Sequence, residues 1–150
     1  MILLVLAYLL FCKIYLFLQL AYTSDLFMFH QLSRSWIEKG LFLQENVYGG
    51  QLPIHNYFLI PLFYPFTLLF GAKGLFVGLW SLMAYALYRL SKFCDGSLLP
   101  FFFLLPVTFW VSDHPTYGFG IELIQVPVSL MFALSLLEKK KRQSYFWAAL

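Results

Sequence analysis

The sequence predicts an all-α protein, built as a polytopic transmembrane helix bundle with one amphipathic helix lying at the membrane surface. Of the 150 residues, 61% are hydrophobic and only 11% are charged, whereas a soluble domain carries roughly 25% charged residues on its surface. The apolar residues gather in blocks comparable in length to a bilayer core of about 30 Å. The longest polar stretch, 23–56, begins with the two-sided pattern of an amphipathic helix.

The apolar residues form consecutive blocks at 1–22, 57–70, 75–90, 98–111 and 118–137. The first block contains one charge, Lys13, and is long enough to cross the bilayer core. The second and fourth blocks are short of the roughly 17–25 residues of a span and contain two prolines each, so whether they cross is left open. A sixth apolar stretch begins at Ser144 and stops after one or two turns at Leu150. We therefore expect a single integral membrane domain over 1–150 that is the N-terminal part of a longer protein or needs partner helices.

The stretch 23–56 is predicted to be an extracytoplasmic loop that contains an interfacial helix. At about 100° per residue, one side of this helix carries Asp25, Phe29, Leu32 and Trp36. The other side carries the polar set His30, Arg34 and Glu38. Arg34 and Glu38 stand four residues apart, a spacing that allows an ion pair. Gly40 is expected to end the helix, which would lie in the interface beside the bundle.

Two membrane topologies place the polar residues differently. If every block crosses and the amino terminus is outside, most basic loops fall inside, as the distribution of positive charge favours. That arrangement puts Asp25 and Asp113 on opposite faces. If the amino terminus is inside and the block 57–70 dips in without crossing, both residues lie outside. We favour the second arrangement because it collects the polar residues in one site.

Asp25 is the leading candidate for chemistry because it directly follows the first apolar block. A carboxylate at the exit of a membrane helix is well placed to meet a polar substrate. An aspartate here is equally typical of a helix cap, and the two interpretations are compatible. Polar groups at membrane edges or within apolar blocks are energetically costly, so the presence of each one needs an explanation. The other candidates are groups of this kind: Gln31, His55, Asn56, Asp113, His114 and Glu122.

Several functions lack support in the sequence. We find no phosphate-binding G-x-x-x-x-G-K-[ST], no G-x-G-x-x-G, no C-x-x-C, no H-E-x-x-H and no G-x-S-x-G pattern. Cys12 lies in an apolar block and Cys94 in a loop, which disfavours a disulfide between them. The net charge of +3 depends on a basic run at 139–142, which is typical of a cytoplasmic helix anchor. A nucleic-acid partner is therefore not expected.

Three short motifs resemble those of an uncharacterised multi-pass prokaryotic membrane family that is related to the GT-C glycosyltransferases. Residues 25–31 (DLFMFHQ) resemble its D-L-x-x-F-x-Q motif, which follows the first membrane helix. Residues 52–55 (LPIH) resemble its L-x-x-H motif, and the His114-Pro115 pair resembles part of its F-H-P-E motif. This chain differs from the family motifs at three positions. The family usually has acidic residues where this chain has His30, Ile54 and Thr116.

The resemblance implies a membrane glycosyltransferase that takes a sugar from a polyprenyl-phosphate donor. It would work on the extracytoplasmic face of the prokaryotic inner (plasma) membrane. Asp25 matches the acidic residue that acts as base toward the acceptor or helps to hold a divalent cation. His55, Asn56 and His114 would contact the phosphate or sugar of the donor. Two other classes stay open: a transporter component with Glu122 along its path, and a non-catalytic subunit or assembly factor that works with a partner membrane subunit.

Overall fold

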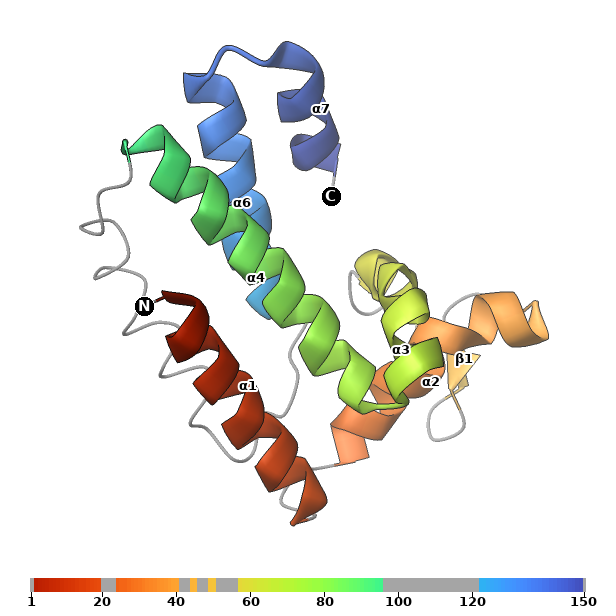
Figure 1. Ribbon diagram of the computed structural model, residues 1–150. Coiled ribbons are helices and arrows are strands. Elements are labelled where there is room, and N and C mark those ends of the chain that lie inside the picture. Colours follow the sequence, from red (N-terminus) through yellow and green to blue (C-terminus); the bar gives the residue numbers. More distant parts are fainter. Residues whose placement is uncertain are drawn as a thin grey trace.

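The computed structural model describes residues 2–19, 24–40, 44–45, 49–50, 57–95 and 122–149. These residues are almost entirely helical, so the predicted all-α class is confirmed. In chain order the helices are α1 (Ile2–Leu18), α2 (Ser24–Lys39), the 3₁₀ helix η1 (Tyr57–Phe63), α3 (Tyr64–Phe70), α4 (Lys73–Phe93), α6 (Glu122–Leu137) and α7 (Lys141–Ala149) (Figure 1). One short antiparallel pair, β1 (Gln44–Glu45) and β2 (Gly49–Gly50), was not predicted.

The helices follow the predicted blocks closely, apart from the block 98–111, which lies outside the described residues. The predicted interfacial helix is α2, and it ends where Gly40 adopts a φ of 66°. The Gly40 N–H donates to the Trp36 carbonyl at 3.0 Å, which is the usual way for glycine to close a helix. The block 57–70 is a continuous segment of η1 followed by α3, here called the η1–α3 rod.

The η1–α3 rod and α4 form a tight hairpin. Gly71, with a φ of 61°, and Ala72 reverse the chain, and the two helix axes differ in direction by 119°. A Cβ atom on Gly74 would lie 2.5 Å from the Thr67 nitrogen and closer still to the Phe66 carbonyl. A Cβ atom on Gly78 would lie 2.6 Å from the ring of Phe63. This G-x-x-x-G pair therefore lets the rod approach the α4 backbone directly.

Helix α2 lies across the rod on the side away from α6 and α7 (Figure 1). The rings of Phe29 and Tyr57 meet edge to face at 5.3 Å. The hydroxyl groups of Ser33 and Thr67 lie 3.1 Å apart in a buried hydrogen bond between α2 and α3. Trp36 was predicted on the same side as Phe29, yet it is 56% exposed. The last turns of α2 extend past the rod, so the described part of the chain does not cover this indole.

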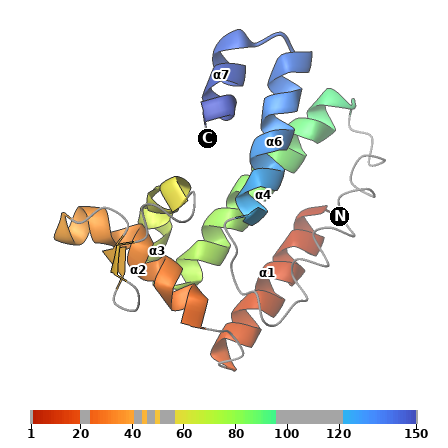
Figure 2. The same ribbon diagram turned by 180° about the vertical axis from the view of Figure 1, so that it is seen from behind.

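The remaining helices pack along α4. Helix α1 runs antiparallel beside it, and Phe17 meets Phe76 edge to face at 6.5 Å. Helix α6 packs on the C-terminal half of α4, and α7 folds back along α6 (Figure 1; Figure 2). Arg89 of α4 binds the carboxylate of Glu138 at the end of α6. The ends of α4 and α6 and the start of α7 thus gather at one end of the molecule.

Among the described helices, none is by itself both long enough and apolar enough to span a membrane. The segments Leu59–Phe70 and Lys73–Phe93 are long and apolar enough together, as a pair bent at the hairpin turn. The thiols of Cys12 and Cys94 are both free.

Candidate functional site

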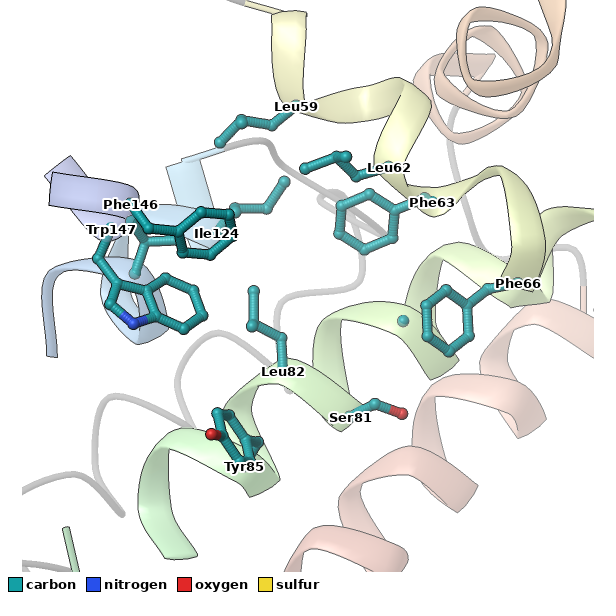
Figure 3. A pocket seen from close by; sticks show the side chains of 12 residues that line it. Leu59, Leu62, Phe63, Phe66, Ser81, Leu82, Tyr85, Ile124, Phe146 and Trp147 are labelled. Atoms are coloured by element: carbon teal, nitrogen blue, oxygen red, sulfur yellow. The ribbon is translucent and has the colours of Figure 1, made fainter. Parts of the chain in front are cut away.

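A cavity of about 380 Å³ opens between the η1–α3 rod, α4, α6 and α7 (Figure 3). Its walls are almost wholly aliphatic and aromatic: Leu59, Leu62, Phe63, Phe66, Gly78, Ser81, Leu82, Tyr85, Ile124, Val128, Phe146 and Trp147. Phe63 and Phe66 from the rod face Phe146 and Trp147 from α7 across the opening (Figure 3). The size falls within the range of about 300–1,000 Å³ that is typical of ligand sites.

The local sequence explains why a cavity forms here. The rod turns one face toward α2, where Tyr57 and Thr67 make their contacts. A second face, with Leu59 and Leu62, turns toward α6 and α7. Because Gly78 has no side chain, the rings of Phe63 and Phe66 lie directly against the α4 backbone at the edge of the cavity.

A second cavity of about 340 Å³ shares Leu59, Val128 and Trp147 with the first. It adds two polar side chains from α6, Gln125 and Ser129. An apolar chamber therefore adjoins one with polar groups. This is the arrangement expected for a ligand that has a hydrocarbon part and a polar part.

The two hydroxyl groups in the first cavity are already engaged. The Ser81 hydroxyl donates to the Val77 carbonyl at 2.7 Å, within α4. The Tyr85 hydroxyl accepts from the Arg89 guanidinium at 3.5 Å. The described residues contain no group of three metal-ligating side chains. The cavity can therefore select a ligand mainly by apolar contact.

The polar face of α2 carries the predicted ion pair. Arg34 Nε donates to Glu38 Oε1 at 2.7 Å. This hydrogen bond lowers the pKa of the Glu38 carboxyl below its usual value. One turn earlier, burial lowers the pKa of His30, and the nearby Arg34 charge lowers it further. The His30 Nε2 atom is buried and has no hydrogen-bond partner among the described residues, so burial disfavours the charged imidazolium.

The structure places only part of the predicted site. Asp25 is the second residue of α2, and Glu122 is the first residue of α6. The structure describes the backbone of these two residues and not their side chains. Gln31 lies in the second turn of α2 and is half-buried. Four further candidates fall outside the described residues: His55, Asn56, Asp113 and His114. The convergence of these groups therefore stays a prediction.

The sequence analysis did not predict either cavity. None of the described lining residues of the two cavities belongs to the predicted site. One signal was available, since Gly74 and Gly78 form a G-x-x-x-G pair in an apolar helix. A second unexpected feature is Lys13, which is only 2% exposed. Ionisable side chains buried among apolar helices are unusual and typically functional.

Comparison of the chain with protein-family models, with curated proteins and with solved structures gave no match.

Proposed function

We propose that this chain is a GT-C-like membrane glycosyltransferase whose cavity holds the hydrocarbon chain of a polyprenyl-phosphate sugar donor. The observation that carries this proposal is the apolar cavity between the η1–α3 rod, α4 and α7. Its aromatic and aliphatic walls suit an isoprenoid chain. The adjoining cavity, with Gln125 and Ser129 from α6, enlarges this space.

The distribution of charge supports a membrane orientation. Charged side chains gather where α4 and α6 end and α7 begins. The basic ones are Arg89, Lys92, Lys139, Lys140, Lys141 and Arg142, and the acidic ones are Asp95 and Glu138. Their net charge is +4, whereas the whole chain carries only +3. Basic residues favour the cytoplasmic side, so this end is inside in our proposal. Helix α4 has 21 residues and is about 31 Å long, which matches the bilayer core.

The hairpin geometry favours the topology in which the block 57–70 dips in without crossing. With a bend of 119°, the rod lies about 61° from the axis of α4. The rod has seven residues of 3₁₀ helix and seven of α helix, which together span about 24 Å. If α4 stands along the membrane normal, about half of that length, roughly 12 Å, is depth. The rod then reaches less than halfway through a core of about 30 Å, and its Gly71 end lies at the outer face.

In this arrangement α2 lies at the outer face, with Asp25 at its start. Asp25 accepts the proton of the acceptor hydroxyl as the acceptor oxygen bonds to the anomeric carbon of the sugar, while the bond from that carbon to the donor phosphate breaks and the polyprenyl phosphate leaves. His55, Asn56 and His114 contact the phosphate or sugar. Three further candidates complete the polar set: Gln31, Asp113 and Glu122. A divalent cation beside Asp25 is an open part of this mechanism.

The test is sugar transfer by the protein in lipid nanodiscs, supplied with radiolabelled polyprenyl-phosphate sugars of long and short chain. Leu82→Trp places a large ring in the cavity and should raise the KM for the long-chain donor more than for the short-chain donor. Leu136→Trp is the matched control, because Leu136 is on α6 and 53% exposed. Asp25→Asn should lower the rate by about 10²–10⁴-fold, the range of general-base assistance.

Other outcomes point to the other classes. Equal effects of the two tryptophan variants on both donors would exclude the cavity as the chain site. A loss of less than about tenfold in Asp25→Asn would remove the base role. Ion-coupled uptake into vesicles without transfer would favour a transporter component. Activity that appears only with a co-purifying membrane subunit would favour an accessory role.

A further inference from the structure

We propose that the turn between α6 and α7 is a docking surface for the headgroups of anionic phospholipids. The surface, here called the basic turn, consists of Glu138 and the cationic residues that follow it, Lys139, Lys140, Lys141 and Arg142. The inference rests on the membrane placement proposed above and is independent of sugar transfer.

Glu138 divides the basic residues at this end into two groups. Its Oε2 atom accepts from Lys140 Nζ at 2.6 Å and also from the Arg89 guanidinium. These two cations are therefore committed to holding α4, α6 and the turn together. Within the described part of the chain, Lys139, Lys141 and Arg142 form no ion pair, and all three are exposed. They are the cations available to an external anion.

The backbone fixes the position of these cations. The Lys140 N–H donates to the Ser135 carbonyl at 2.9 Å, and the Lys139 N–H donates to the Leu136 carbonyl at 3.0 Å. Together with a φ of 57° at Lys139, these bonds form a Schellman motif. The chain then enters α7 directly, and the Ser144 N–H donates to the Lys140 carbonyl at 3.0 Å. The basic turn is thus a defined loop between two helices.

The start of α7 is electrostatically unfavourable until an anion is bound. Lys141 and Arg142 are its first residues, and its first turn contains no acidic side chain. A helix N-terminus carries a partial positive charge, so cations there repel it and anions stabilise it. A phosphate placed at the turn would interact favourably with both the side-chain cations and the free N–H groups of the first turn.

The neighbouring side chains favour a phospholipid over a nucleic acid. Leu136 and Leu137, directly before the turn, are 53% and 63% exposed. Tyr145, one turn into α7, is 73% exposed. Apolar side chains, then cations, then an exposed tyrosine are the sequence found where a helix leaves the acyl region and reaches the headgroups. A nucleic acid would bury these leucines against phosphate, which is unfavourable.

The experiment titrates the detergent-purified full chain with dioctanoyl phosphatidylglycerol and with dioctanoyl phosphatidylcholine, following tryptophan fluorescence and native mass. The test variant is Lys141→Gln with Arg142→Gln. The control, Lys39→Gln with Lys73→Gln, removes the same charge outside the basic turn. A basic residue near an anionic surface contributes about fivefold to binding. We therefore expect the test variant to lose about 25-fold in affinity for phosphatidylglycerol, and the control to lose less than about threefold.

Two further readouts make the result decisive. Glu138→Gln frees Lys140 and Arg89 from the carboxylate, so it should strengthen phosphatidylglycerol binding, and high salt should weaken binding in every form. Equal affinity for the two lipids, or equal losses in the test and control variants, would overturn the proposal. Stronger binding of a short DNA duplex than of phosphatidylglycerol would assign the surface to nucleic acid. None of these measurements depends on sugar transfer, so each proposal can fail alone.

Discussion

Gly74→Ala is the substitution that most directly probes the hairpin between the η1–α3 rod and α4. The added methyl group would lie 2.5 Å from the Thr67 nitrogen and closer still to the Phe66 carbonyl. Ordinary van der Waals contact begins at 3.4 Å, so the rod must move away by about 1 Å. Because the obstructing atoms are backbone, no side-chain rotation relieves the contact.

The cost follows from two opposing terms. Overpacking a well-packed core typically costs about 1–3 kcal/mol, and a rigid backbone obstacle places this case at the upper end. Alanine is a better helix former than glycine by about 1 kcal/mol. We therefore expect Gly74→Ala to destabilise the chain by about 2 kcal/mol. The shift should also lengthen the Ser33–Thr67 hydrogen bond, which is 3.1 Å in the native chain.

Gly78→Ala provides a matched comparison on the same helix. Its methyl group would meet two side-chain rings, Phe63 at 2.6 Å and Phe66 at 3.0 Å. Both rings line the adjoining cavity and can shift into it, so the net change should be within about 1 kcal/mol of zero. The assay is unfolding of the detergent-purified protein, followed by tryptophan fluorescence. Equal stability of the two variants, or a stabilised Gly74→Ala, would refute the close backbone approach.

Three further predictions concern single sites. Lys139→Gly should raise the stability by about 1 kcal/mol, because glycine adopts the left-handed φ of 57° without steric cost; Lys139→Ala keeps that cost, and a similar gain there in thermal unfolding would contradict the explanation. The pKa of His30 is lowered from its ordinary value of 6.5, so as the pH falls the unfolded chain takes up a proton before the folded chain does. Stability should therefore be complete above pH 6.5 and fall as the pH drops below it, and Gln at position 30 should flatten that slope in pH-dependent unfolding. Ser33→Ala should cost about 1 kcal/mol through the lost bond to Thr67, and a double-mutant cycle with Thr67→Val that gives no coupling energy would show that the bond contributes nothing.

Much of the helical pattern could be predicted from the sequence because it depends on local signals. The apolar blocks set the extents of α1, α4 and α6, and Gly40 ends α2 as expected. The Arg34–Glu38 pair follows from helical spacing alone. These features need no knowledge of any partner element.

The parts that were missed depend on contacts between segments far apart in the chain. The G-x-x-x-G pair at Gly74 and Gly78 acquires its meaning only when the rod is known to cross it. The cavity needs α7 to bring Trp147 opposite Phe63. Trp36 is exposed because the rod is too short to cover the end of α2. The apolar periodicity of α2 contains no information on the length of the helix that packs against it. The convergence of Asp25 with His55 and His114 depends on segments outside the described residues.

The most direct test of the account is cysteine accessibility in membrane vesicles. Single cysteines replace Lys39, Lys73 and Lys140 in a chain whose Cys12 and Cys94 are changed to serine, and each is exposed to a membrane-impermeant maleimide. We expect positions 39 and 73 to react from the outer face and position 140 to react only after permeabilisation. Labelling of positions 39 and 73 from opposite faces would mean that the η1–α3 rod crosses the bilayer. Labelling of all three without permeabilisation, in protein that alkaline carbonate extracts, would contradict the membrane placement itself.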